Sequence, residues 1–259
     1  MHAGMDWDIE RMLAAAVFTG TRISGLLVFA PFLGSASIPM RVKAGLAVAL
    51  TLLLSPVYGP SRMSFAELSW GRVMISEALI GLLMGLTVEF IFEAAQVAGQ
   101  ILGIQMGFSL VNIIDPQTQV DTPVLSTFFQ LVTLLIFLTL NVHHWLLRGI
   151  VASFGYLPAG TGTVGLPVMG QLLHMAGGIW LAAVQIAAPA LLATMMADVV
   201  LGFLGKASPQ LPVLFIGLSV KSVLGLLVMC GSVALWPQRF EQSFATAIAR
   251  AEQLLHLAR

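Results

Sequence analysis

The sequence contains few charged residues, and this scarcity limits what the protein can be. Only 9% of its 259 residues are charged, whereas 58% are apolar. Soluble globular domains carry about 25% charged residues. The mean hydropathy of +0.94 is correspondingly high. This composition excludes an ordinary water-soluble enzyme and indicates an integral membrane protein in contact with lipid.

Cysteine and net charge are nearly absent as well. Cys230 is the single cysteine, so no internal disulfide and no cysteine-based metal site can form. Basic and acidic residues balance to a net charge of zero, which leaves no polybasic surface for nucleic acid. The sequence also lacks a P-loop, an H-E-x-x-H and a G-x-S-x-G pattern. We therefore expect no enzyme, no cofactor, no bound metal and no nucleic-acid partner.

Long apolar runs separate the few charges. A membrane-spanning helix needs about 20 mostly apolar residues, and the hydrophobic segments lie at about 12–31, 41–58, 73–95, 124–145, 172–204 and 211–236. We predict an all-α integral membrane protein of about six long hydrophobic helices in hairpins. The fifth segment is longer than a bilayer requires, so it is expected to be tilted, broken near Pro189 or extended beyond the membrane.

The two ends of the chain carry different signals. Asp6, Asp8 and Glu10 precede the first apolar segment, which therefore lacks the basic flank of a cleavable signal peptide and is expected to be retained. Residues 237–259 alternate apolar with charged side chains, as an amphipathic surface helix does. With six spans, the distribution of Lys and Arg favours both termini in the cytoplasm. That count assumes that each apolar segment crosses lipid on its own.

Six charged residues lie inside apolar segments. A charge at the bilayer centre costs at least about 2.5–3.5 kcal/mol, so these groups should face protein or water. Asp198 lies eleven residues before Pro209 and Lys221 twelve after it. Two antiparallel helices would place both at one depth, which predicts a buried ion pair, with a proton relay as the alternative. The six residues are Arg22, Glu77, Glu89, Glu93, Asp198 and Lys221.

The third segment combines a polar stripe with regularly spaced glycines. At about 100° per residue, Glu89, Glu93, Gln96 and Gln100 fall within an arc of roughly 60° on one helix. This stripe should line a water-filled passage or meet polar groups of another subunit. Spacing of four residues between glycines allows helices to approach closely. The glycines concerned are Gly81, Gly85, Gly99, Gly103 and Gly107.

The stretch from 103 to 126 interrupts the apolar pattern. It has no Lys or Arg, unlike a short cytoplasmic loop, and its turn-forming Asp115-Pro116 follows several bulky apolar residues. Irregular backbone at membrane depth is tolerated only inside protein or along a cavity. The stretch is therefore either a surface loop with a re-entrant foot or an internal plug. The plug residues would be Met106, Gly107, Phe108, Leu110, Ile113, Ile114, Asp115, Pro116 and Gln117.

Several dispersed motifs resemble the FliR/SctT family of type III secretion export-gate proteins, and the central one favours its flagellar branch. The family's opening is matched by Arg22-Ile-Ser-Gly and Ile38-Pro39-Met40-Arg41. Its centre is matched by Met106-Gly107-Phe108 through Ile114-Asp115-Pro116-Gln117 to Thr122-Pro123-Val124. Later matches are Asn141-Val142-His143-His144-Trp145, Asp198-Val199-Val200-Leu201-Gly202 and Ser208-Pro209-Gln210-Leu211-Pro212. These motifs occur in order over about residues 20 to 236.

The resemblance implies a non-enzymatic subunit of a helical export gate, assembled with FliP and FliQ in the bacterial inner membrane at the flagellar basal body. It implies a FliP-like part at 1–171, a plug loop at about 103–123, a FliQ-like hairpin at 172–236 and the tail 237–259. FlhB and FlhA homologues would be further partners, with unfolded flagellar proteins as cargo. By this likeness many apolar helices face other subunits, which makes the topology counted from charges unsafe.

The apolar character of the central stretch suggests a mechanism. Large, flexible side chains such as Met106, Phe108 and Ile114 can exclude water from a resting pore and still deform around a passing chain. Two other functional classes were weighed. A secondary transporter would use Glu77, Glu89, Glu93, Asp198 and Lys221 to bind ions or protons. An intramembrane enzyme would need a metal at His143, His144 and His174, which are better explained as interfacial side chains.

Overall fold

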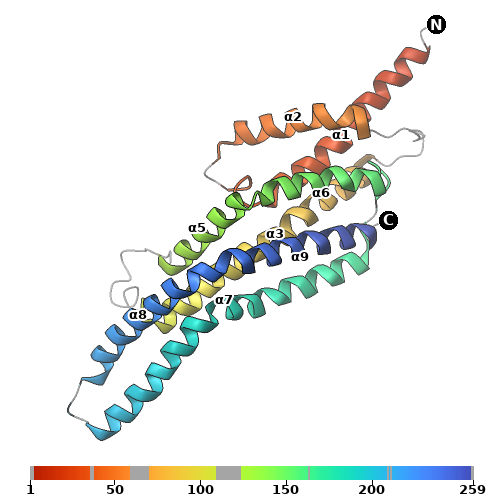
Figure 1. The fold of residues 1–259 in the computed structure, drawn as a ribbon. Helices are drawn as coiled ribbons and strands as arrows, with labels where there is room; N and C mark the ends of the chain where they lie inside the picture. Colours follow the sequence, from red (N-terminus) through yellow and green to blue (C-terminus); the bar gives the residue numbers. More distant parts are fainter. Residues whose placement is uncertain are drawn as a thin grey trace. The chain divides into compact units, whose positions relative to one another are not determined.

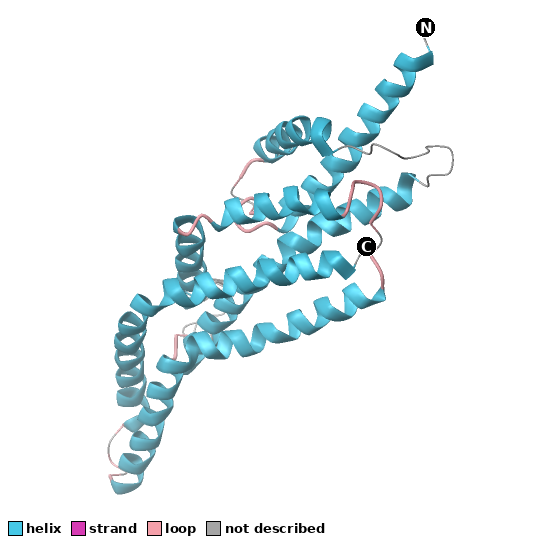
Figure 2. Cartoon of the chain, turned by 45° about the vertical axis from the view of Figure 1, so that its right-hand side comes forward, coloured by secondary structure: helices cyan, strands magenta, loops and turns pink. Residues whose placement is uncertain are grey.

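A computed structural model describes residues 3–35, 38–58, 70–108, 124–162, 164–208, 210 and 212–257. These parts are helical and contain no strand (Figures 1 and 2), which confirms the all-α prediction. The helices are α1 (Ala3–Phe29), α2 (Met40–Tyr58), α3 (Trp70–Gln105), α5 (Val124–Thr139), α6 (Val142–Tyr156), α7 (Leu166–Ala207), α8 (Val213–Ser232) and α9 (Trp236–Leu257), with the short 3-10 helix η2 (Val233–Leu235).

The helices support a multi-pass membrane protein. Among the described residues, five helices are long and apolar enough to cross a bilayer, and six spans result if α5 and α6 count as one. Two helices extend well beyond the predicted segments, since α3 has 36 residues and α7 has 42. Helix α7 also continues through Pro189, so the predicted break there is wrong. Two of the predicted explanations for the length of α7 are left. The helix is tilted in the membrane, or it extends beyond the membrane.

The predicted segment at 124–145 is occupied by two helices rather than one. Helices α5 and α6 are bent by 64° relative to each other. At the break, Asn141 has φ 55° and ψ 32°, a left-handed conformation that asparagine adopts more readily than most residues. Since a left-handed residue cannot continue a right-handed helix, the chain turns here although no charged residue interrupts the segment. Periodicity alone carries no signal for such a break.

The C-terminal tail forms the expected amphipathic helix, but its apolar side is covered by protein. Its buried residues follow helical spacing, and they are Trp236, Phe240, Phe244, Ala247, Ala251, Leu254 and Leu255. Helix α9 is joined to α8 through η2 with no intervening loop. An amphipathic stripe packs equally well on a protein core or a membrane surface, and in this fold it packs on the core.

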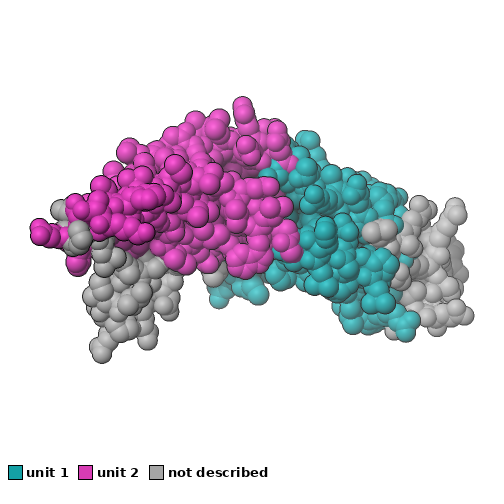
Figure 3. Space-filling model, turned by 90° about the horizontal axis from the view of Figure 1, so that it is seen from below, with its two compact units in different colours: residues 1–90, 138–176, 243–259 teal, residues 91–137, 177–242 magenta. Residues whose placement is uncertain are grey.

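The chain divides into two compact units (Figure 3). Unit 1 comprises residues 1–90, 138–176 and 243–259, and unit 2 comprises residues 91–137 and 177–242. In unit 1, α1 and α3 approach closely, because a Cβ placed on Gly25 or Gly81 would overlap the backbone carbonyl of Ala78 or Arg22, respectively. A Cβ on Gly85 would lie 2.8 Å from the carbonyl oxygen of Leu26. The glycine spacing thus brings these two helices into backbone contact.

Unit 2 uses glycine in the same way between α3 and α5. A Cβ on Gly99 would lie 2.6 Å from the Cα of Ser126. The hydroxyl of Ser126 donates to the carbonyl oxygen of Gln96 at 3.1 Å, which ties the two helices at that point. Aromatic side chains fill the neighbouring space, with Phe129 and Trp236 centred 4.8 Å apart. The small residues of α3 therefore serve packing along both of its portions.

Candidate functional site

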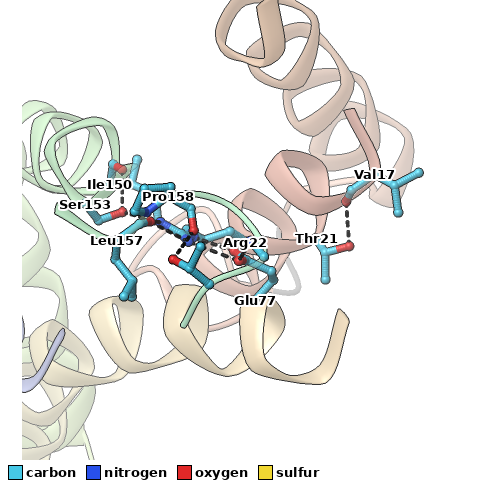
Figure 4. A network of polar contacts seen from close by, with 10 residues as sticks. Val17, Thr21, Arg22, Glu77, Ile150, Ser153, Leu157 and Pro158 are labelled. Atoms are coloured by element: carbon cyan, nitrogen blue, oxygen red, sulfur yellow. Dashed lines mark hydrogen bonds and ion pairs between the residues drawn. The ribbon is translucent and has the colours of Figure 1, made fainter. Parts of the chain in front are cut away.

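The first polar cluster lies inside unit 1 and joins α1 to α3. The Nε–H of Arg22 donates to Oε2 of Glu77 at 2.6 Å, and the Nη2–H donates to Oε1 at 3.1 Å. Both side chains are 0% exposed. The structural interpretation of intramembrane charges as ion pairs between helices therefore holds for these two residues. Figure 4 shows them pointing toward each other from their separate helices.

The remaining donors of the Arg22 guanidinium bind the end of α6. Nη1 and Nη2 each donate to the carbonyl oxygen of Leu157 at 3.0 Å, and Nη1 also donates to the Ser153 hydroxyl at 3.0 Å (Figure 4). The aromatic ring of Phe154 lies 4.2 Å from the guanidinium carbon. A guanidinium has five N–H donors, and all five of them have acceptors here.

Glu77 is satisfied in the same way. Its Oε1 accepts a hydrogen bond from the backbone N–H of Gly160 at 2.6 Å, in addition to the bonds from Arg22. Gly160 has φ 89°, a left-handed conformation that suits glycine. One buried ion pair therefore holds the turn that follows α6 against α1 and α3. Neither side chain of the pair reaches solvent.

The second polar cluster lies in unit 2 and contains the predicted ion pair. Lys221 Nζ lies 2.9 Å from Asp198 Oδ1, so the antiparallel counting across the turn is confirmed. The pair is not buried within this chain, because the Asp198 side chain is 45% exposed and that of Lys221 19%. The amide of Gln105, at the end of α3, donates to Asp198 Oδ2 at 2.8 Å. The carboxylate thus links three helices.

The end of α3 is a well-formed helix cap. Gly107 has φ 85°, its N–H donates to the carbonyl of Ile104 at 3.1 Å, and the N–H of Phe108 donates to the carbonyl of Gly103 at 2.9 Å. This pair of bonds is the Schellman motif that ends many helices at glycine. The predicted plug stretch, placed from about 103, therefore begins inside a helix. The sequence signal for this helix end is the glycine at 107, whose spacing of four residues from Gly103 had indicated close packing instead.

The structure describes only the first three of the nine predicted plug residues, Met106, Gly107 and Phe108. Met106 is 0% exposed, and a Cβ on Gly225 would lie 2.7 Å from its terminal methyl carbon. Met106 therefore fills the contact between α3 and α8. Phe108 is 38% exposed. The other six lie outside the described residues: Leu110, Ile113, Ile114, Asp115, Pro116 and Gln117.

Two of the four residues of the predicted polar stripe on α3 are exposed to solvent. Glu93 and Gln100 are exposed, whereas Gln96 is half-buried, and all three belong to unit 2. Glu89 belongs to unit 1, is half-buried and has an interaction partner. Between the polar positions, Ala94, Ala95 and Ala98 are buried. The face that carries the carboxylate of Glu93 and the amide of Gln100 is thus available to water or to another subunit.

Large apolar side chains cover much of the accessible surface. No residue of α2 is buried, and α7 and α8 expose many aliphatic and aromatic side chains. On α7 these include Leu192, Met195, Met196, Val199, Val200 and Phe203, and on α8 Phe215, Ile216, Val223 and Leu227. Exposed apolar area of this extent indicates contact with lipid or with other subunits.

Sequence reasoning missed several residues that complete these clusters. No contact with the buried charges was predicted for Ser153, Leu157 or Gly160. The carbonyl of Leu157 and the N–H of Gly160 are backbone groups and leave no side-chain signature. Gln105 lies outside the polar stripe and was also missed. Within the described parts of the chain, no group of three or more His, Cys, Asp or Glu side chains is arranged to hold a metal ion.

Long apolar helices and internally paired charges define an all-α, multi-pass integral membrane protein. The chain belongs to the family of bacterial export proteins, family 1, whose profile matches residues 13–247. It is 31% identical to the flagellar biosynthetic protein FliR of Escherichia coli K12 over 83% of this chain and 82% of that protein.

Two further relatives carry the same name. The FliR of Bacillus subtilis 168 is 32% identical over 87% of this chain and 89% of that protein. The FliR of Pectobacterium carotovorum is 26% identical over 92% of both. These matches extend over most of each chain, so the resemblance inferred from dispersed motifs is confirmed.

Proposed function

We propose that this chain is a structural subunit of the flagellar type III protein export gate in the bacterial inner membrane. With FliP- and FliQ-type subunits it forms the closed pore through which unfolded flagellar proteins are exported during flagellum assembly. The observation that carries this proposal is the likeness to proteins named flagellar biosynthetic protein FliR over most of their length. FlhB- and FlhA-type proteins are proposed as further partners of the same complex.

The uncovered apolar helices support assembly with other subunits. Helix α2 buries none of its residues within this chain, and the spans of α7 and α8 leave most of their apolar side chains accessible. Lipid can cover such surfaces, but the accessible carboxylates of Glu93 and Asp198 would be costly in lipid. Neighbouring protein or a water-filled pore is the environment that satisfies both kinds of side chain.

The central stretch is the proposed seal of the resting pore. Phe108, together with Leu110, Ile113 and Ile114, would exclude water by apolar contact and yield to a passing chain. Asp115, Pro116 and Gln117 would form the turn within the stretch. Because Met106 is buried against α8, it supports the start of the stretch and is not counted among the sealing side chains.

The polar stripe of α3 has a proposed role in the same assembly. Glu93, Gln96 and Gln100 would line the pore or meet polar groups of a neighbouring subunit. The pore-lining arrangement would let amide side chains exchange hydrogen bonds with the backbone of a passing chain. Export energy is expected to come from partner proteins or the proton gradient, since the sequence contains no P-loop.

The transporter alternative gains no support from the charged residues. Glu77, which that hypothesis needs as an exchangeable carboxylate, is 0% exposed and accepts hydrogen bonds from both Arg22 and Gly160. Such a carboxylate is closed to solvent and fully occupied. We propose a non-enzymatic, pore-forming subunit in preference to a carrier of small solutes.

The mass of the detergent-purified assembly tests the proposal. The tagged chain is expressed together with its FliP- and FliQ-type partners, and the mass and composition of the purified particle are measured. A large complex that contains all three chains is expected. A stable monomer or homodimer in the presence of both partners would contradict the proposal.

Ion leakage through that complex tests the seal. Deletion of residues 108–116 is expected to raise the leak across membranes that contain the assembled complex, compared at equal complex yield. The control is the assembled complex with residues 108–116 intact and Arg72→Gln, a substitution at an exposed position of α3. Unchanged conductance after the central deletion would refute the sealing role.

A further inference from the structure

The start of the proposed sealing stretch is attached to the hairpin of α7 and α8 by side chains. Gln105, the last residue of α3, donates to Asp198 of α7 at 2.8 Å. Lys221 of α8 binds the other oxygen of the same carboxylate at 2.9 Å. The carboxylate therefore joins the end of α3 to both helices of the hairpin.

A second attachment is made through the backbone one residue later. The hydroxyl of Ser222 donates to the carbonyl oxygen of Met106 at 2.8 Å and also lies 2.9 Å from the carbonyl oxygen of its own helix at Leu218. The carbonyl of Met106 lies past the last helical residue of α3 and would otherwise need water. Ser222 thus satisfies a helix-end acceptor from a different helix.

Packing makes the attachment rigid. Gly225 leaves room for the Met106 side chain, and a Cβ on Gly107 would overlap the side chain of Leu218. Because Gly107 is held at φ 85° within the cap, the direction in which the chain leaves α3 is determined at this point. Phe108 follows immediately. Its position is therefore set by α8 as much as by α3.

We propose that Gln105, Lys221 and Ser222 are positioning residues that mount the start of the central stretch on the α7–α8 hairpin, so that the position of Phe108 follows the hairpin. This inference rests on the proposed gate function for its consequence, which is that displacement of the hairpin loosens the seal of the resting pore. The mount consists only of residues 105–108 and their partners on α7 and α8. It therefore predicts defects from substitutions outside the sealing stretch.

The first experiment tests whether these contacts hold the position of residue 108, by a measurement that does not depend on export. The exposed native thiol is removed as Cys230→Ser, and Phe108→Cys is introduced as a reporter in the assembled complex. The rate of maleimide labelling at this thiol is compared with and without Ser222→Ala. Loss of one hydrogen bond is expected to raise the labelling rate roughly fivefold.

Matched controls separate the mount from general damage to α8. Ser219→Ala removes a hydroxyl of the same helix whose bond, among the described residues, stays within that helix, to the carbonyl of Phe215 at 3.4 Å, and it should leave the rate unchanged. Ser222→Thr retains the hydroxyl and should restore the rate. Gln105→Met, which keeps the size of the side chain but has no amide, should raise the rate as Ser222→Ala does.

The second experiment measures ion leakage of the resting complex with Ser222→Ala, Gln105→Met or Ser219→Ala in chains that retain Phe108, at equal complex yield. Ser222→Ala and Gln105→Met are expected to raise the leak several-fold, and Ser219→Ala is not. An unchanged labelling rate in Ser222→Ala and Gln105→Met overturns the mount. A raised labelling rate with no added leak, in a complex that does leak after deletion of 108–116, overturns its link to the seal. If that deletion itself causes no leak, the sealing role fails and the mount is judged on labelling alone.

Discussion

Arg22 and Glu77 form a two-point ion pair, Nε to Oε2 at 2.6 Å and Nη2 to Oε1 at 3.1 Å, with neither side chain exposed. The pair also holds the carbonyl of Leu157 and the N–H of Gly160. Removal of either partner would leave a charge inside the protein without a counterion. The stability of unit 1 is therefore expected to depend strongly on this pair.

Neutralising one member of the pair should destabilise the chain strongly. Arg22→Gln or Glu77→Gln is expected to cost about 3–5 kcal/mol, because the remaining charge stays buried and unpaired. The measurement is thermal unfolding of the purified chain in detergent, together with its abundance in the membrane. Arg72→Gln, at an exposed position of α3, is the control and should change neither quantity. A small effect at position 22 equal to that at 72 would contradict the assigned role.

Exchanging the two charges should not restore stability. In Arg22→Glu with Glu77→Arg, the new carboxylate at 22 would face the Leu157 carbonyl oxygen, and Gly160 would lose its acceptor. The double variant is therefore expected to remain as unstable as the single ones, by the same thermal unfolding assay. Recovery of near wild-type stability would show that only the charge pairing matters and that the bonds to the turn do not.

Widening the contact between α1 and α3 should also destabilise unit 1. Gly81→Ala places a Cβ against the carbonyl of Arg22, and the expected cost is at the upper end of about 1–3 kcal/mol for overpacking. Gly170→Ala, in an open and exposed part of α7, should be neutral or stabilising, because alanine is the better helix former. Comparable unfolding temperatures for the two variants would be inconsistent with this close contact.

The cap of α3 should require glycine. Gly107→Ala is expected to cost about 1–2 kcal/mol for the left-handed conformation alone, with a further cost from overlap with Leu218. Gly202→Ala on α7, where nothing lies within 4 Å, is the control. Amide hydrogen exchange at the end of α3 should quicken in the first variant only. Equal protection in both would argue against this cap.

The bend between α5 and α6 should tolerate glycine and reject β-branched residues. Asn141 has φ 55°, so Asn141→Gly is expected to leave the unfolding temperature nearly unchanged. Asn141→Val should lower stability by about 1–2 kcal/mol, since valine rarely adopts that conformation. Both variants lack the asparagine side chain, so the difference between their stabilities reports the cost of the left-handed backbone conformation at residue 141. No difference would place the cause of the bend elsewhere.

The two ion pairs differ in how far sequence could predict them. Asp198 and Lys221 lie on consecutive helices, so counting residues from the turn that the sequence predicts near Pro209 was sufficient to pair them, and the ion pair at 2.9 Å agrees with that count. Arg22 and Glu77 are 55 residues apart, and their pairing depends on where α1 crosses α3. The glycine spacing predicted a close approach at Gly81, but it did not indicate that α1 is the helix that meets α3 there.

The ends of the helices likewise differ in how far the sequence could predict them. The apolar run of the third segment was placed at about 73–95, and the polar stripe on the same helix extended the predicted helix to Gln100. The helix continues to Gln105, since polar side chains on one exposed face do not disturb backbone hydrogen bonds. Conversely, 124–145 has no Asp, Glu, Lys or Arg and is mostly apolar, yet it contains a 64° bend. Hydropathy reports the environment of side chains and carries little information on the backbone dihedrals that end a helix.

By itself the sequence determined that this is an all-α membrane protein with few charges, that those charges must be paired or kept from lipid, and that its motifs belong to a bacterial export family. These conclusions follow from composition, from the cost of charge in hydrocarbon and from local order of residues. Only the tertiary structure decided which groups meet. It paired Arg22 with Glu77, joined Gln105 to Asp198 and buried Met106. Such contacts depend on the crossing of helices distant in the chain, which is a property of packing and has no local signature.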